Sequence, residues 1–201
     1  EQMQLTDFYN ESYKYFEEKY GNVKWTVCPK IDAVSRENKL GELFCEAEVR
    51  SAELSLLEKK YMVTRNEFYV AVTLLAIAIS TKANDVQVSW IYNGRDDLIA
   101  SSSVGLFFRD LPVALRLNDE MTLRDIFAEV QEQVKNGIKY SCYPYNEIDS
   151  QVVEGDDTCV LYQRDLREVC DFGGLVVEQM EIRQNKAASQ AILDIQILDG
   201  G

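Results

Sequence analysis

The residues that could carry catalysis are limited by one absence, because none of the 201 residues is a histidine. For this chain alone, that count excludes Ser-His-Asp and Cys-His nucleophilic mechanisms, a histidine general base and a histidine-ligated zinc ion. Any catalysis by this chain alone would have to use carboxylates, Cys, Lys or Tyr.

Three short motifs contain acidic residues that catalysis or metal binding could use. Asp171-Phe172-Gly173 spells the metal-binding triplet of protein kinases, but the glycine-rich loop and the His-Arg-Asp loop of those enzymes are missing. Gly155-Asp156-Asp157 is typical of an exposed turn. Asp96-Asp97 has no spaced partner for acid–base work. We therefore predict no catalytic residue and no metal site in this chain.

The cysteines indicate the cellular compartment, and the net charge disfavours some classes of partner. The five cysteines are odd in number and contain no Cys-x-x-Cys pair, so we expect reduced thiols and a cytoplasmic protein. The 34 acidic and 21 basic residues give a net charge of −13, which disfavours nucleic acid and anionic membranes. The longest apolar run, Phe68 to Ile79, is too short to span a bilayer, and residues 1–4 are no signal peptide.

The first half of the chain predicts helices and one strand. Aromatic residues predict a helix over residues 5–20. Alternation over 41–50 predicts a half-buried strand, and 51–60 is typical of a short helix. A capping box at Thr64-Arg65-Asn66-Glu67 precedes a helix over about 65–81, which is apolar nearly all round and which we expect to be buried.

The second half predicts more strands and one further helix. We expect strands over 86–92 and over 104–117, with Pro112 placing the latter at a sheet edge or a bulge. A second capping box at Thr122 opens a helix to about Gly137. Further strands are predicted over 159–162, 175–177 and 191–198. The pattern indicates an α/β fold formed by residues 1–201 as one unit.

Five of these segments, in order, resemble motifs in the C-terminal half of a nonribosomal peptide synthetase condensation domain. They are Val63-Thr64 with the apolar helix behind it, the strand ending in Asn93-Gly94-Arg95, the segment Val104 to Pro112, the capped helix over 123–137, and Tyr140 to Glu147 with its Tyr-Pro pair. Two departures stand out. Arg109-Asp110 replaces the family's Asn-Thr pair, and Ser141-Cys142 stands where the family has His-Gln-Asp.

The resemblance implies a chloramphenicol-acetyltransferase-like lobe, with a mixed β-sheet and helices packed mainly on one face. The family's His-His-x-x-x-Asp-Gly motif lies in an N-terminal lobe, which we expect to be absent from this chain. This lobe would supply a tunnel wall and docking surface for carrier proteins. Their phosphopantetheine arms deliver the thioesters that are joined into an amide, as in peptide antibiotic biosynthesis. An adjacent adenylation domain is also an expected partner, and the chain alone should be inactive.

The resemblance also assigns structural roles to residues of the lobe junction. Arg95 would support the active site by pairing with the aspartate of the missing motif, since a guanidinium binds a carboxylate bidentately, and Gly94 would allow tight backbone beside it. The remaining motif positions would line or shape the junction, with the two tyrosines interpreted mainly as packing residues: Gly105, Phe107, Arg109, Asp110, Pro112, Tyr143, Pro144 and Tyr145.

Two alternatives stay open. The lobe could come from an epimerisation or cyclisation domain, or from another acyltransferase of the superfamily. It could instead be a non-catalytic interaction module, because residues 149–183 contain nine acidic and three basic residues. We also expect weak homodimerisation through the apolar face that would meet the other lobe.

Overall fold

The structure, a computed structural model, describes residues 7–21, 23–27, 50–95, 102–148, 158–164 and 193–199. Its helices are α1 (Asp7–Tyr20), α2 (Ser51–Tyr61), α3 (Arg65–Thr81) and α5 (Leu123–Tyr140), with a short 3-10 helix, η2 (Tyr145–Glu147). The helices expected over 5–20, 51–60, 65–81 and 123–137 are confirmed, the last being one turn longer. The strands expected over 41–50 and 175–177 lie outside the described residues, apart from Arg50.

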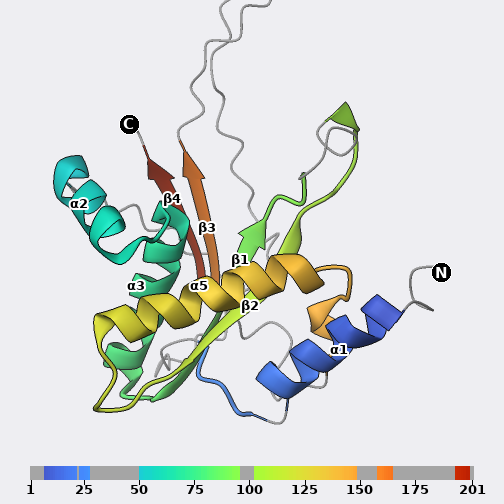
Figure 1. Ribbon diagram of the computed structural model, residues 1–201, viewed down its shortest axis with the longest axis horizontal. Coiled ribbons are helices and arrows are strands. Elements are labelled where there is room, and N and C mark those ends of the chain that lie inside the picture. The colour runs from blue at the N-terminus through green and yellow to red at the C-terminus, as the bar shows by residue number, and fades with distance from the viewer. Residues whose placement is uncertain are drawn as a thin grey trace, which may run out of the picture.

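A four-stranded mixed sheet lies at the centre, in the order β2–β1–β3–β4. β1 (Asp85–Tyr92) pairs antiparallel with β2 (Arg109–Arg116). β3 (Thr158–Arg164) is parallel to both β1 and β4 (Leu193–Asp199). The carboxyl ends of β1, β3 and β4 therefore lie at one end of the sheet, where β2 begins, as the arrowheads in Figure 1 show.

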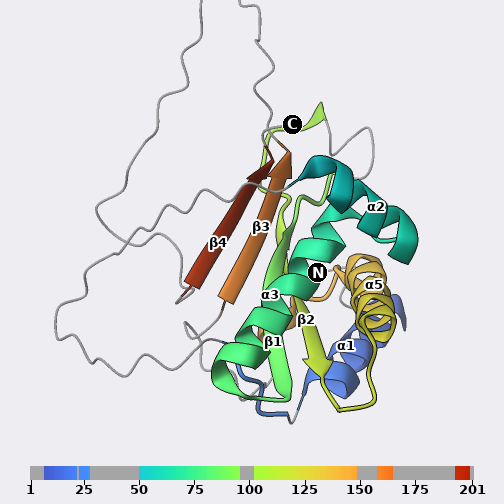
Figure 2. The same ribbon diagram turned by 90° about the vertical axis from the view of Figure 1, so that its left-hand side faces the viewer.

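α3 and α5 cover one face of this sheet. Directly paired residues point to the same side, so Val86, Val88, Trp90 and Tyr92 of β1 share a face with Leu111, Val113 and Leu115 of β2. All seven are buried. Figure 2 shows α2, α3 and α5 on the same side of the strands. This arrangement confirms the predicted α/β class, with a mixed sheet and helices mainly on one face.

Both predicted capping boxes form. At α3, the Glu67 N–H donates to Thr64 Oγ1 (3.3 Å) and the Thr64 N–H donates to Glu67 Oε2 (2.7 Å). At α5, Thr122 and Asp125 make the same reciprocal pair, and the hydrogen bonds from Thr122 lower the pKa of the Asp125 carboxyl. These bonds fix where each helix begins, because they satisfy backbone N–H groups that have no partner within the helix.

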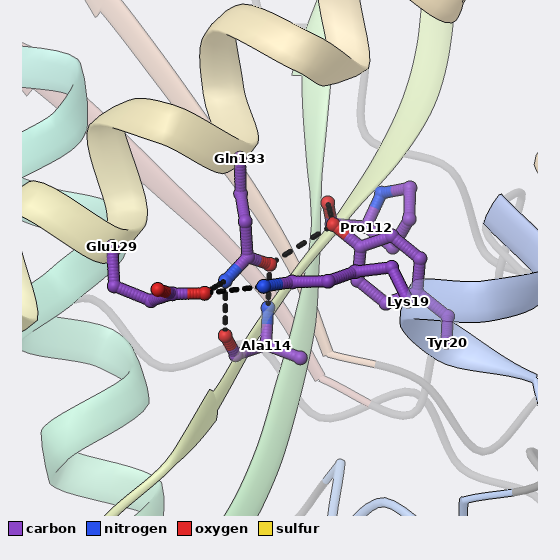
Figure 3. Close-up of polar contacts among 6 residues, drawn as sticks. All are labelled: Lys19, Tyr20, Pro112, Ala114, Glu129 and Gln133. Carbon is purple, nitrogen blue, oxygen red and sulfur yellow. Dashed lines mark hydrogen bonds and ion pairs between the residues drawn. The ribbon is translucent and has the colours of Figure 1, made fainter. Parts of the chain in front are cut away.

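Side chains from α1 and α5 seal the outer edge of β2 (Figure 3). The Ala114 N–H donates to Gln133 Oε1 (2.8 Å), and Gln133 Nε2 donates to the Ala114 carbonyl (2.6 Å). The Tyr20 hydroxyl donates to the Pro112 carbonyl (3.0 Å) and also contacts Gln133 Oε1 (2.9 Å). The amide of Gln133 thus takes the place of a neighbouring strand, and the edge offers no free pairing group at Pro112 or Ala114.

The position of Pro112 confirms the predicted edge strand. Its carbonyl faces α1 and not β1, so its missing N–H also lies on the outer side, where no ladder bond is lost. Glu129 of α5 extends the contacts of Gln133, because it accepts from Gln133 Nε2 (2.8 Å) and forms an ion pair with Lys19 of α1. Burial raises the pKa of Tyr20 well above its ordinary value, so its hydroxyl stays a donor.

Two predictions about these elements are wrong. The strand expected over 104–117 is β2, which begins only at Arg109, because residues 103–107 are held as a loop by Arg95. The helix over 65–81 is not buried all round. Val72 and Ile79 are exposed, because α3 packs against the sheet and α5 on its other sides.

Candidate functional site

The candidate site lies at the carboxyl end of β1, where the chain turns away from the sheet. Gly94 has a φ of +64°, a conformation that L side chains rarely adopt. A Cβ at this position would lie 2.0 Å from the Phe107 carbonyl oxygen. Both facts require glycine, so the tight backbone predicted at Gly94 exists. At Gly105 a Cβ would make only ordinary contact with the Phe107 ring, at 3.4 Å.

Arg95 binds the backbone of the returning chain. Its guanidinium donates to the carbonyls of Ser103 (Nη1, 2.9 Å) and Gly105 (Nη2, 3.0 Å). It also lies over the Phe107 ring, 4.6 Å from the centroid. We call Arg95, Ser103, Gly105 and Phe107 the Arg95 clamp. The predicted pairing of Arg95 with an aspartate of another lobe stays a prediction, because that aspartate lies outside this chain.

The loop held by the Arg95 clamp has one half-buried aromatic side chain and three exposed apolar side chains. Phe107 is half-buried under the guanidinium. Val104 is fully exposed, Leu106 is 76% exposed and Phe108 is 46% exposed. We call Val104, Leu106 and Phe108 the exposed segment. Large apolar side chains that lie together in water are typical of an interaction surface.

Arg109 and Asp110 begin β2 beside this segment. Arg109 pairs with Tyr92 in the ladder and donates from Nε to the Ser141 carbonyl (3.3 Å), which connects β2 to the end of α5. Asp110 is exposed and pairs with Ile91. Pro112, in contrast, lies at the sealed outer edge of β2 and not at the carboxyl end of β1. The structure therefore brings Arg95, Phe107 and Arg109 together but separates Pro112 from them.

Tyr143, Pro144 and Tyr145 form a second group that packs against α1. The Tyr143 ring lies 5.0 Å from Tyr9 and 5.4 Å from Tyr13, and the Tyr145 ring lies 5.5 Å from Tyr20. The Tyr145 hydroxyl accepts from Gln87 Nε2 (2.8 Å). Pro144 precedes η2 and accepts from the Glu147 N–H (3.0 Å). These contacts agree with a packing role for both tyrosines.

Trp90 and Tyr92 were not singled out by sequence, although they precede the Asn-Gly-Arg turn. Trp90 is 5% exposed and Tyr92 8% exposed, and their rings are 5.9 Å apart on the helix-covered face of the sheet. Within the described part of the chain, neither the Trp90 indole N–H nor the Tyr92 hydroxyl has a hydrogen-bond partner. Two polar aromatic residues at i and i+2 before a turn were the available signal, but a missing partner is visible only in three dimensions.

Among the described residues, no group of three Cys, Asp or Glu side chains is placed to hold a metal ion. No single helix there is long and apolar enough to cross a membrane. One pair, Ala52–Tyr61 with Arg65–Thr81, passes by length and composition but is bent by 90°, and core helices of many globular proteins pass the same criterion.

Several solved structures that this chain resembles in fold are condensation domains, and another is an X-domain. The first condensation domain of the CDA synthetase is 18% identical, with a TM-score of 0.63, and the match covers 87% of this chain and 40% of that one. The condensation domain of the Monacolin K polyketide synthase MokA is 14% identical, with a TM-score of 0.57 and coverages of 78% and 41%. The X-domain in complex with OxyB from teicoplanin biosynthesis is 15% identical, with a TM-score of 0.59 and coverages of 78% and 37%.

These likenesses show a shared fold, and this chain spans about two fifths of the length of those structures. No curated protein matches the chain in sequence. Residues 32–166, about two thirds of the chain, match the family described as Condensation domain. That stretch contains Gly94, the Arg95 clamp, the exposed segment and the tyrosine-rich turn. The chain therefore belongs to the condensation domain family.

Proposed function

We propose that this chain is one lobe of a nonribosomal peptide synthetase condensation domain, which forms amide bonds between carrier-bound aminoacyl or peptidyl thioesters. The chain has no histidine, so the histidines of the family's motif would come from an N-terminal lobe. Our lobe would supply one wall of the tunnel and part of the carrier docking surface. The chain spans about two fifths of the length of the solved CDA synthetase condensation domain.

The observation that carries this proposal is the exposed segment held out by the Arg95 clamp. Three apolar side chains lie in water at the carboxyl end of β1, and a rigid guanidinium contact fixes the loop that bears them. Burying such side chains against another surface is favourable by about 25 cal/mol for each Å² removed from water. We propose the N-terminal lobe as the surface that covers them.

A reconstitution experiment tests this function. The chain would be mixed with a separately produced N-terminal lobe carrying His-His-x-x-x-Asp-Gly and with two carrier proteins loaded with aminoacyl thioesters. We expect no dipeptide from the chain alone and dipeptide from the mixture. Amide formation by the isolated chain would refute the assignment of catalysis to the missing lobe.

A matched pair of variants locates the docking surface. Leu106→Asp should abolish dipeptide formation, because a carboxylate would have to be buried between the lobes. Ile79→Asp is the control, since Ile79 on α3 is equally exposed (78%) but lies on another surface. Equal loss of activity in both variants would argue against the exposed segment as the docking surface.

The exposed segment is also our proposed contact for weak homodimerisation of the lone lobe. Sedimentation at high protein concentration should detect dimer in the native chain and less in Leu106→Asp. A clean monomer for the native chain would contradict this part of the proposal.

A non-catalytic interaction module is the second candidate. Two observations favour it: the chain contains no histidine, and one of the similar structures, the teicoplanin X-domain, is a complex with another protein, OxyB. If the reconstituted mixture makes no dipeptide although the two lobes bind each other, this second candidate would be preferred.

A further inference from the structure

The two unpaired polar groups at the carboxyl end of β1 are unusual for a well-packed sheet. Buried polar side chains nearly always have a hydrogen-bond partner, because an unpaired N–H or O–H loses its hydration without compensation. The other tryptophan follows the rule, since Trp25 Nε1 donates to the Tyr20 carbonyl (3.1 Å). Among the described residues, four buried side-chain polar atoms lack a partner, and of these only Trp90 Nε1 and the Tyr92 hydroxyl are neighbours on one face of one strand; the others are the Tyr15 hydroxyl and Gln87 Oε1.

Their position in the fold is one where ligands commonly bind. Open α/β sheets bind ligands beyond the carboxyl ends of parallel strands, and β1, β3 and β4 end together here. Trp90 pairs with Leu111 on β2 and with Val160 on β3. α5 lies over Leu111 at Gly137, whereas α3 lies over β3 through the stacked Tyr69 and Tyr162 rings, 5.5 Å apart. Trp90 and Tyr92 therefore lie between the contacts of these two helices with the sheet.

The chemistry of the pair defines what could bind. An indole N–H is only a donor, and a phenol hydroxyl is a donor that can also accept. The surrounding side chains, such as Leu111 and Val160, are apolar and buried, so a charged ligand would be disfavoured. A neutral carbonyl oxygen at the end of an apolar chain fits both conditions.

We propose that Trp90 and Tyr92 bind a carbonyl oxygen of the substrate, the thioester or amide carbonyl of an acyl chain that enters at the carboxyl end of β1. This inference rests on the proposed function, which supplies acyl thioesters as substrates. The Arg95 clamp begins three residues beyond Tyr92 and fixes the loop beside the site. The two donors hold the carbonyl in place and take no part in bond making.

Nuclear magnetic resonance of the ¹⁵N-labelled chain tests the proposal directly, because the sequence has only two tryptophans and hence two indole N–H signals. The probe is S-acetyl-N-acetylcysteamine, which offers a thioester and an amide carbonyl. We expect the Trp90 signal to move on titration and the hydrogen-bonded Trp25 signal to stay. A Trp90 signal that does not move, or that moves together with Trp25, would overturn the proposal.

Tyr92→Phe removes only the hydroxyl oxygen. It distinguishes a hydroxyl that binds a ligand from one that is already paired, for example with a buried water. It should weaken probe binding by about 2- to 10-fold, the loss expected for one hydrogen bond. It should not lower the urea midpoint of the free chain, because the hydroxyl has no partner there. The control is Tyr145→Phe, which loses the bond from Gln87 and should lower the midpoint. An equal fall in both variants would mean that the Tyr92 hydroxyl is already paired in the free chain, which would overturn the proposal.

Trp90→Phe assigns the indole signal. If that variant does not fold, the assignment follows from Tyr92→Phe, which should shift the signal of the adjacent Trp90 more than that of Trp25. Failure of this site is distinguishable from failure of the proposed function. A chain that binds the probe but gives no dipeptide after reconstitution retains the site and loses the function. A chain that gives dipeptide but never binds the probe retains the function and loses the site.

Discussion

The outer edge of β2 and the carboxyl end of β1 are only a few residues apart in the ladder but have opposite properties. At the edge, Gln133 and Tyr20 satisfy the free backbone groups of Pro112 and Ala114, and their own polar atoms are paired. At the carboxyl end, two buried polar atoms have no partner among the residues that the structure describes, and three apolar side chains are exposed.

This difference separates scaffold from site. A satisfied buried network stabilises one arrangement of α1, α5 and β2, and leaves nothing for a partner to bind. Unpaired donors and exposed apolar side chains lower the stability of the free chain, and they become favourable only when something else covers them. The comparison predicts that variants of the paired edge residues change stability, whereas variants of the unpaired donors and of the exposed segment mainly change binding.

The largest effect is expected at Gln133. Gln133→Leu should lower the free energy of unfolding by roughly 3 kcal/mol, because the Ala114 N–H and carbonyl both become buried without a partner. Gln131→Leu on the same helix is the control and should cost less than about 1 kcal/mol, since its main bond, to the Met62 carbonyl, is exposed. Urea unfolding measures both. Similar losses would show that the Ala114 bonds are not what holds this edge.

The next effect is expected at Gly94. Gly94→Ala should cost about 2 kcal/mol or more, because alanine disfavours a φ of +64° and its Cβ would collide with the Phe107 carbonyl. Gly105→Ala, in the same loop but without a positive φ, should change stability by less than about 0.5 kcal/mol. Thermal unfolding of the pair checks this order, and equal losses would contradict it.

A smaller and local effect is expected for the Arg95 clamp. Arg95→Met should lower overall stability by only about 1 kcal/mol, since the guanidinium is partly exposed, but should increase amide hydrogen exchange over residues 103–107. Arg116→Met is the matched control, because Arg116 also lies over an aromatic ring, that of Trp25, at the other end of the sheet. Exchange over 103–107 that is unchanged in Arg95→Met would show that the clamp does not hold the loop.

The smallest effect concerns the capping box of α5. The hydrogen bonds from Thr122 hold the pKa of Asp125 below its ordinary value of 3.8. A lowered folded-state pKa means that this carboxylate stabilises the fold above about pH 4 and loses that contribution as the pH falls through its folded pKa. The difference in urea midpoint between the native chain and Asp125→Asn should therefore shrink from pH 7 to pH 3. A constant difference would contradict the linkage.

The sequence predicted the local structure well because the signals are local. Thr64 and Thr122 each precede an acidic residue by three positions, and both helices begin there. Pro112 restricts its strand to an edge, since proline has no N–H for a second neighbour. The motif resemblance also found the correct family, because five segments in order are far more specific than any one alone.

The candidate site was only partly predictable. Gly94 and Arg95 were identified as junction residues from the Asn-Gly-Arg turn, but the partners of Arg95 within the chain, Ser103 and Gly105, were not foreseen. The strand predicted from Val104 was wrong for the same reason. Apolar residues indicate a strand, but the hydrogen bonds from Arg95 to the Ser103 and Gly105 carbonyls hold this stretch as a loop outside the ladder.

The sequence by itself determined the helices, their caps, the edge position of Pro112 and the absence of any histidine chemistry, since each depends on residue type and near neighbours. Only the tertiary structure decided that Gln133 pairs with the backbone of Ala114 and that the Trp90 indole N–H and the Tyr92 hydroxyl find no hydrogen-bond partner among the described residues. The physical reason is the same in both cases. Whether a polar group is satisfied depends on what distant segments bring to it, and no local pattern in the chain records that.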